Sequence, residues 1–128
     1  MKRLTNAVIL LLGLSMATMM SSCKKDNAQL IVGKWEIVRH FESGQSIDPS
    51  NIAPSMYDNH DAGEIWEFSS DGVWSHRHET GTYLIQGDVL TLLVGFSWNF
   101  DIYELTNSSL KFGGFAFGYH YYELKKVG

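Results

Sequence analysis

Apolar and polar residues alternate along most of the chain after residue 30, and turn signals recur about every ten residues. Alternation with a period of two is typical of strands that bury one face, and short links between such runs favour antiparallel hairpins. Consecutive strands with short links predict an all-β, up-and-down antiparallel barrel, with an open sandwich as the alternative. The pattern predicts eight strands, at Leu30–Glu42, Glu64–Ser69, Val73–Glu79, Thr82–Gln86, Val89–Val94, Ser97–Leu105, Ser109–Phe115 and Tyr119–Lys126.

Two turns set the register of neighbouring strands. Gly87-Asp88 fits a two-residue hairpin with Gly87 in its first, positive-φ position, which pairs Tyr83 with Leu92. At Ser70-Asp71-Gly72, a two-residue and a three-residue loop are both possible. We prefer the three-residue loop because it separates apolar from charged side chains, whereas a slip of one residue would invert both faces. The inner face then holds Trp66, Phe68, Trp74, His76 and His78.

Strict alternation also assigns the faces of the other long strands. The first strand turns Arg39 inward with Gly33, Trp35, Ile37 and Phe41, and turns His40 outward. The inner residues of the sixth and last strands are Trp98, Phe100, Ile102, His120, Tyr122 and Leu124.

One long connection, Ser43–Gly63, interrupts the series of hairpins. Asp48-Pro49 within it is typical of the start of a short helical turn, with Asp48 as the cap. Long loops in compact domains are usually functional or mobile. We therefore expect Ile52, Met56 and Tyr57 of this loop to cover an open end of the barrel.

The N-terminus has the order of a secretory signal: a basic pair at Lys2-Arg3, an apolar run, and small residues before Cys23. A transmembrane helix is the alternative, although the run is short for one. Met20-Ser21-Ser22-Cys23 resembles the lipobox of bacterial lipoproteins. That resemblance implies cleavage before Cys23, acylation of its thiol and of the new amine, and a lipid anchor in the outer membrane. We expect a signal peptide at 1–22, a lipidated tether at 23–29 and the barrel at 30–128, facing either the periplasm or the cell surface.

Charge and cysteine content narrow the classes of partner. The chain has 10 Lys and Arg against 14 Asp and Glu, a net charge of −4. Loss of residues 1–22 removes Lys2 and Arg3, which leaves 106 residues and a net charge of −6. An acidic domain gains no electrostatic attraction to nucleic acid, so we expect no nucleic-acid partner. A single Cys excludes a disulfide framework.

Several short motifs together indicate a family. Gly33-Lys34-Trp35 opens the first strand, Asp71-Gly72 and Gly87-Asp88 follow at set spacing, and a Tyr-rich strand ends in Lys125-Lys126. The arrangement resembles the lipocalin-like domain lipoproteins common in Bacteroidetes. The resemblance implies a calycin-type barrel in which Gly33 and Trp35 are structural and Trp35 packs at the closed end. In lipocalins an Arg stacks on this Trp, and here Lys125 or Lys126 would have to take its place.

The predicted interior suggests a binding site. A guanidinium inside a barrel would bind a carboxylate or phosphate bidentately, and aromatics around it would hold an apolar body. The alternative for Arg39 is a position near a strand end from which its stem reaches solvent. The candidate ligand-binding residues are Arg39, Trp66, Trp74, His76, His78, Trp98 and His120.

A metal site is a weaker hypothesis. His76-x-His78 on a strand would place two imidazoles on one face, and His120 would complete a zinc-type triad. No carboxylate or Cys stands at metal-ligand spacing beside them, so we predict no metal at these residues.

The expected function follows from these features. The chain has no Gly-x-Ser-x-Gly motif and scatters its carboxylates over solvent faces, so we predict no catalytic residue and no cofactor. The sequence predicts a lipid-anchored protein that binds a small hydrophobic or amphipathic ligand without catalysis. The alternative is a filled barrel whose 43–63 loop or Gly113–Gly118 hairpin meets a protein partner.

Overall fold

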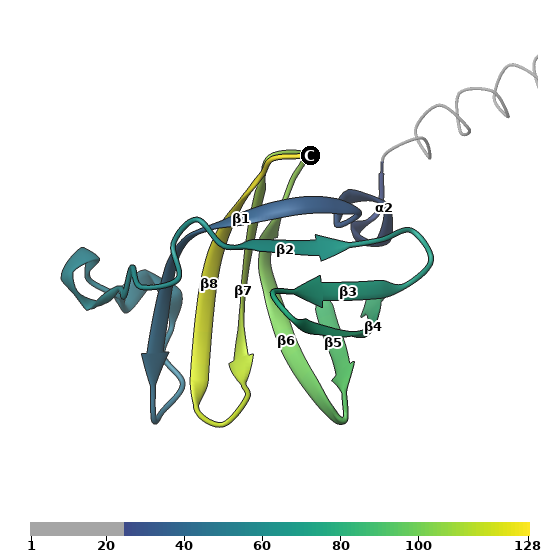
Figure 1. Cartoon of the computed structure of the whole chain (residues 1–128). Helices are drawn as coiled ribbons and strands as arrows, with labels where there is room; N and C mark the ends of the chain where they lie inside the picture. The colour runs from purple at the N-terminus through teal and green to yellow at the C-terminus, as the bar shows by residue number, and fades with distance from the viewer. Residues whose placement is uncertain (1–24) are drawn as a thin grey trace, which may run out of the picture.

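The computed structural model describes residues 25–128, so the predicted signal peptide and Cys23 lie outside the described residues. Eight antiparallel strands pair in chain order, and β1 also pairs with β8, which closes the barrel (Figure 1). The predicted all-β, up-and-down barrel is confirmed. None of the helices in the described part is long and apolar enough to cross a membrane. The elements are α2 (Asn27–Leu30), β1 (Gly33–Ser43), the 3₁₀ turns η1 (Pro49–Asn51) and η2 (Pro54–Met56), β2 (Ile65–Phe68), β3 (Val73–His76), β4 (Glu79–Gln86), β5 (Val89–Val94), β6 (Phe96–Leu105), β7 (Ser109–Phe115) and β8 (Tyr119–Lys126).

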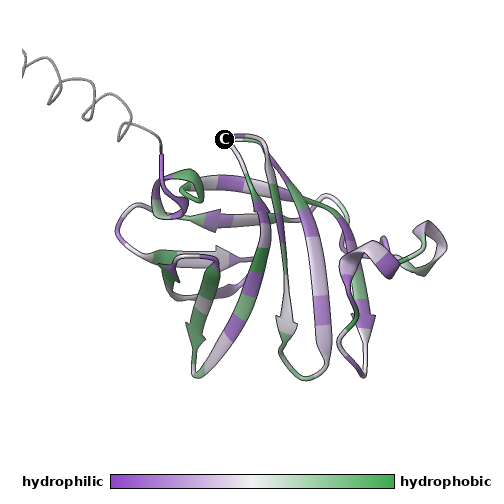
Figure 2. Ribbon diagram, turned by 180° about the vertical axis from the view of Figure 1, so that it is seen from behind, coloured by the Kyte–Doolittle hydropathy of each residue, from purple (hydrophilic) through white to green (hydrophobic). Residues whose placement is uncertain are grey.

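The two registers predicted from turn chemistry are confirmed. Tyr83 pairs with Leu92 across the β4–β5 hairpin, and Phe68 pairs with Trp74 across β2 and β3. The predicted positive φ is present in both turns, at Gly87 (59°) and at Gly72 (85°). Figure 2 shows the resulting change between hydrophobic and hydrophilic residues along the strands.

The predicted end of the third strand is wrong. β3 ends at His76, and the hairpin turns at Arg77-His78, where Arg77 has a φ of 56°. Gly81, which looks like a turn residue, lies inside β4. A Cβ there would meet a carbonyl oxygen of β5, that of Leu93, at 2.4 Å. Gly81 therefore allows β4 and β5 to approach closely. His78 lies in the β3–β4 turn and not on the inner face of a strand.

The predicted faces of β1 are correct only for its first half. Ile37 pairs with Leu124, but Arg39 already pairs with Glu123, so Val38 is an extra residue in a β-bulge. Two residues then oppose one, and every later side chain changes face. Arg39 consequently lies outside the barrel, and His40 is buried with 2% of its surface exposed.

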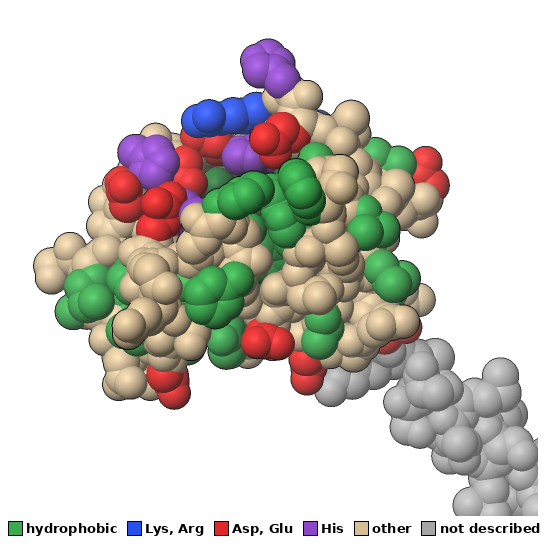
Figure 3. Space-filling model, turned by 90° about the horizontal axis from the view of Figure 1, so that it is seen from below, with side chains coloured by type: hydrophobic (Ala, Val, Ile, Leu, Met, Phe, Trp, Pro, Cys, Tyr) green, Lys and Arg blue, Asp and Glu red, His purple; other side chains and the backbone are tan. Residues whose placement is uncertain are grey.

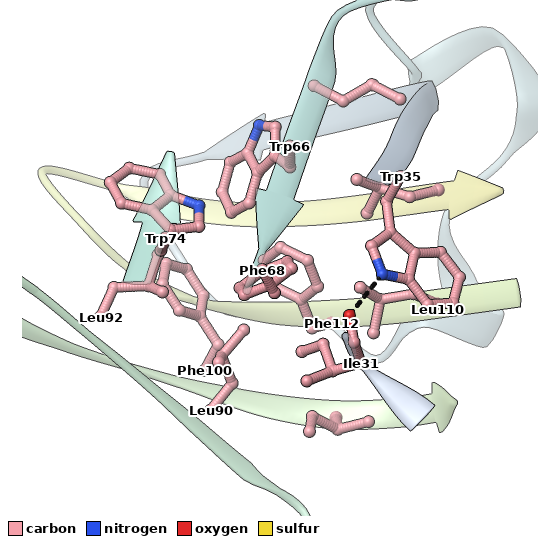
Figure 4. Close-up of a cluster of buried hydrophobic side chains, with 13 residues drawn as sticks. Ile31, Trp35, Trp66, Phe68, Trp74, Leu90, Leu92, Phe100, Leu110 and Phe112 are labelled. Atoms are coloured by element: carbon pink, nitrogen blue, oxygen red, sulfur yellow. Dashed lines mark hydrogen bonds between the residues drawn. The ribbon is translucent and has the colours of Figure 1, made fainter. Parts of the chain in front are cut away.

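The closed end of the barrel is built around Trp35, which is fully buried (Figure 4). Its Nε1–H donates a hydrogen bond of 2.7 Å to the carbonyl of Ile31, just after α2. The Nζ of Lys126 lies 5.0 Å from the centre of the Trp35 ring, while Lys125 pairs with a surface carboxylate. Gly33 has a φ of 135° and leaves no room for a Cβ beside Lys126.

A second, smaller cluster lies on the outside of the barrel. The buried Ile52 packs with Phe41, Tyr119 and Tyr121 on the outer faces of β1 and β8. The predicted helical start is confirmed at η1, where the Asp48 side chain accepts from the backbone of Ser50. The prediction that Ile52 and Tyr57 of this loop cover an open barrel end is wrong, because both pack in this outer cluster. The bulge explains the difference, because it turns Phe41 outward and creates an apolar outer surface for the loop.

Candidate functional site

A cavity of about 400 Å³ lies in the barrel interior beside the β3–β4 turn. Figure 3 shows the lower end of the molecule, where His and charged side chains gather next to a group of hydrophobic ones. Apolar and aromatic side chains form the walls of the cavity, and polar ones surround its mouth. The residues that line it are Trp66, Trp74, His76, Arg77, His78, Glu79, Leu92, Trp98, Phe100, Ala116, His120 and Tyr122.

Two tryptophans form the deepest part of the wall. Trp66 and Trp74 are 4% and 2% exposed, and their rings meet edge to face at 5.3 Å. Figure 4 shows them next to each other within the buried hydrophobic cluster. The Nε1 atoms of both are buried and have no hydrogen-bond partner among residues 25–128. A buried donor without a partner costs about 1–3 kcal/mol, so packing these two rings carries a local cost in stability.

One side of the mouth carries a compact charged group. Glu64 lies between His76, whose Nε2 is 2.6 Å from its Oε1, and the guanidinium of Arg77. Burial acts to raise the pKa of Glu64, but hydrogen bonds from Arg77 and His76 outweigh it and hold that pKa below its usual value. Arg77 keeps 63% of its side chain exposed, so its guanidinium remains accessible at the mouth.

Aromatic rings of β1 and β8 stack beside the mouth. His40 stacks on Tyr122 with ring centres 4.0 Å apart, and its Nε2 lies 2.9 Å from Nδ1 of His120. Burial lowers the pKa of His40, and it raises the pKa of Tyr122. Strict alternation missed His40, because its inward position depends on the bulge at Val38.

The structure brings together most of the residues that the sequence nominates for ligand binding. Trp66, Trp74, His76, His78, Trp98 and His120 all line the cavity. Arg39 does not, and its predicted place in the interior is wrong. Its guanidinium pairs with Glu123 and lies 3.8 Å from the centre of the Tyr57 ring, outside the barrel. The guanidinium at the mouth belongs to Arg77 instead.

The three histidines of the hypothetical zinc triad do not converge. His76 is bound to Glu64, His78 is in the turn, and His120 faces His40. A different group among residues 25–128, His40, Glu42 and His60, has ligand atoms within 4.8 Å of one another.

A family model of the lipocalin-like domain matches residues 31–112, which is more than half of the chain. The chain belongs to the lipocalin-like domain family. No curated protein and no solved structure matched it. The match to the lipocalin-like domain begins at Ile31, whose carbonyl accepts the hydrogen bond from Trp35, and ends at Phe112 in β7. It includes the three cavity tryptophans but ends before His120, so part of the cavity wall of this lipocalin-like barrel lies beyond it.

Proposed function

We propose that this lipocalin-like barrel binds one small, partly apolar molecule in its cavity and does so without catalysis. The observation that carries the proposal is the cavity of about 400 Å³, whose wall includes Trp66, Trp74 and Trp98. Sites for small molecules usually enclose about 300–1,000 Å³ and combine apolar walls with a few placed polar groups. The volume is at the lower end of that range, so the ligand is small.

The lining residues suggest the chemistry of the ligand. Trp66, Trp74 and Trp98 offer flat apolar surfaces to a ring or a short acyl chain. An acidic group on the ligand would meet Arg77 at the mouth.

Native mass spectrometry tests the proposal directly. The full chain is exposed to a lipid and metabolite extract of a bacterial envelope and then weighed without unfolding. We expect a discrete bound mass that Ala116→Leu abolishes, because Ala116 lines the cavity and the larger side chain fills it. Ala53→Leu, on the exposed outer loop, is the matched control and retains the mass. A bare protein mass with every extract, or equal occupancy in the two variants, would refute ligand binding.

We also propose a lipid anchor at Cys23 in the outer membrane. The support is the lipobox-like Met20-Ser21-Ser22-Cys23 and the position of α2, the first described element, at the closed end of the barrel (Figure 1). An anchor there would hold the closed end nearest the bilayer and the cavity mouth away from it. Mass analysis of the N-terminal peptide tests this proposal. We expect an acylated Cys23 after expression in a bacterial envelope, and loss of membrane association in Cys23→Ala.

A protein-interaction role is the second candidate. Its support is the exposure of three phenylalanines near the β5–β6 and β7–β8 turns, Phe96 (65%), Phe115 (55%) and Phe117 (86%). Exposed aromatic groups of this kind are typical of contact surfaces. If every extract leaves the protein bare, these side chains become the first place to search for a partner.

A further inference from the structure

A cluster of histidines and carboxylates lies beside the cavity mouth, at the paired strands β1 and β8. The bulge turns His40 and Glu42 to the same face of β1, and Glu42 pairs in register with His120 of β8. His60 comes from the long connection, two residues after Asp58, which forms a β-bridge with His40. Imidazoles from β1, β8 and the long connection, and a carboxylate from β1, therefore lie close together although these segments are far apart in sequence.

The distances between these groups match those of metal ligands. His40 Nε2 lies 2.9 Å from His120 Nδ1, and Glu42 Oε1 lies 3.7 Å from each of these two nitrogens. Zinc binds nitrogen and oxygen at about 2.0–2.2 Å in a tetrahedron, which sets neighbouring ligand atoms roughly 3.3–3.5 Å apart. The triangle therefore has the size of one tetrahedral face. His60 also presents a ligand atom within 4.8 Å of those of His40 and Glu42.

Hydrogen-bond partners determine which nitrogens carry lone pairs. His120 Nε2 lies 3.0 Å from the carbonyl oxygen of Ala116, an acceptor, so the proton of a neutral ring is at Nε2. His40 Nδ1 lies 2.9 Å from a carboxylate oxygen of Asp61, an ion-pair contact rather than a regular hydrogen bond, which favours the proton at Nδ1. The lone pairs of His40 Nε2 and His120 Nδ1 then face each other at 2.9 Å. Two lone pairs at this distance repel unless the rings share an additional proton or a metal ion binds both nitrogens.

The surrounding charge favours a metal cation in that place. Asp61 is only 6% exposed, and its Oδ1 has no hydrogen-bond partner among the described residues. His60 Nδ1 is 2.8 Å from Asp58, so this ring too has one nitrogen held by a carboxylate and the other free. Histidines that bind zinc commonly donate their second nitrogen to a carboxylate or a backbone carbonyl. All three rings follow that arrangement.

We propose that His40, His120 and Glu42 bind a divalent transition-metal ion of the zinc type, with His60 as a further ligand. Imidazole with a single carboxylate suits Zn²⁺, whereas Mg²⁺ and Ca²⁺ prefer sites made of oxygen. The site differs from the hypothetical triad of His76, His78 and His120, with which it shares only His120. It does not rest on the proposed ligand, although a metal at His120 would lie on the wall of the cavity.

Calorimetric titration with Zn²⁺ tests the site. The full chain is used without a His tag and with Cys23→Ser, so that neither a tag nor a thiol competes for the metal. We expect one ion per chain, no binding of Mg²⁺, and at least about tenfold weaker Zn²⁺ binding in Glu42→Gln and in His120→Asn. Glu42 is 53% exposed, so its replacement leaves the fold intact. The matched control is Glu36→Gln, the same change on the outer face of the same strand, and it binds Zn²⁺ like the parent.

Thermal unfolding provides the second measurement. An ion that binds only the folded state raises the melting temperature, and the shift grows with the logarithm of the ion concentration relative to its Kd. We expect Zn²⁺ to raise the melting temperature of the parent and of Glu36→Gln, and to leave that of Glu42→Gln nearly unchanged. The proposal is overturned if millimolar Zn²⁺ produces neither heat nor a shift, since a shared proton would then join His40 and His120. It is equally overturned if Glu36→Gln loses binding as Glu42→Gln does.

Discussion

Trp35 offers the sharpest test of how the barrel is closed. Its ring is fully buried, and its Nε1–H donates to the carbonyl of Ile31 at 2.7 Å. Replacement by Ala removes both the packing and the hydrogen bond. Replacement by Phe removes the hydrogen bond and keeps most of the apolar ring. The pair of variants therefore separates the two contributions to the free energy of unfolding.

The expected magnitudes follow from burial. Truncation of a buried Trp to Ala typically costs 3–5 kcal/mol, or about half the stability of a typical domain. In Trp35→Phe the buried Ile31 carbonyl is left without its donor, which costs about 1–3 kcal/mol. We therefore expect losses of about 2 kcal/mol for Phe and about 4 kcal/mol for Ala. Trp98→Phe, at the half-buried cavity mouth, serves as the control and costs less than about 1 kcal/mol.

Urea unfolding followed by circular dichroism measures these differences. The midpoint is expected to fall in the order Trp98→Phe, Trp35→Phe, Trp35→Ala, with an unchanged dependence on urea. If Trp35→Ala unfolds at the same midpoint as the parent, the ring does not seal the barrel and the assignment of the closed end fails. If the Phe and Ala variants lose equal stability, packing of the ring contributes nothing beyond its hydrogen bond.

Three further perturbations address the strand contacts, an ion pair and a turn. Gly81→Ala is expected to cost about 1–3 kcal/mol in urea unfolding because its Cβ would overlap a β5 carbonyl, whereas Gly44→Ala, with open space around it, costs little. Burial acts to raise the pKa of Glu123, but Arg39 outweighs it and the pKa is lowered. The stability advantage over Glu123→Gln is therefore full above about pH 4.3 and is lost as the pH falls through the lowered pKa, and a melting-temperature difference that grows on acidification would contradict this. Phe117→Gly, at a φ of 58° and 86% exposure, is expected to raise the melting temperature by relieving about 1 kcal/mol of backbone strain, and a lower melting temperature would show that the ring is needed for packing.

Local chemistry explains which parts of the fold the sequence predicts correctly. The turns at Gly72 and Gly87 need a positive φ, which the residue types reveal without any knowledge of the rest of the chain. Gly81 has the same appearance in the sequence, but the reason for it is a neighbouring strand. Because that contact is non-local, no short segment distinguishes it from a turn.

The candidate sites show the same division. The cavity tryptophans follow from alternation along strands with correct registers, so Trp66, Trp74 and Trp98 are predictable. The cluster around His40 depends on one extra residue in β1 and on a carboxylate from the long connection, Asp61. Neither the bulge nor this carboxylate leaves a periodic signal in the sequence. Strict alternation therefore assigns Arg39 to the inner face and His40 to the outer face, the reverse of the structure.

Because of the bulge at Val38, the number of residues in β1 determines which of its side chains face the barrel interior, as much as their identity does. Deleting this one residue would return the second half of the strand to its original phase, with Arg39 inside the barrel and His40 in solvent. The same side chains would then present a guanidinium to the interior in place of an imidazole. Among homologous barrels, a gain or loss of a single residue between the Trp35 and His40 positions would thus change the interior chemistry more than most substitutions, and an alignment that ignores it would equate residues on opposite faces.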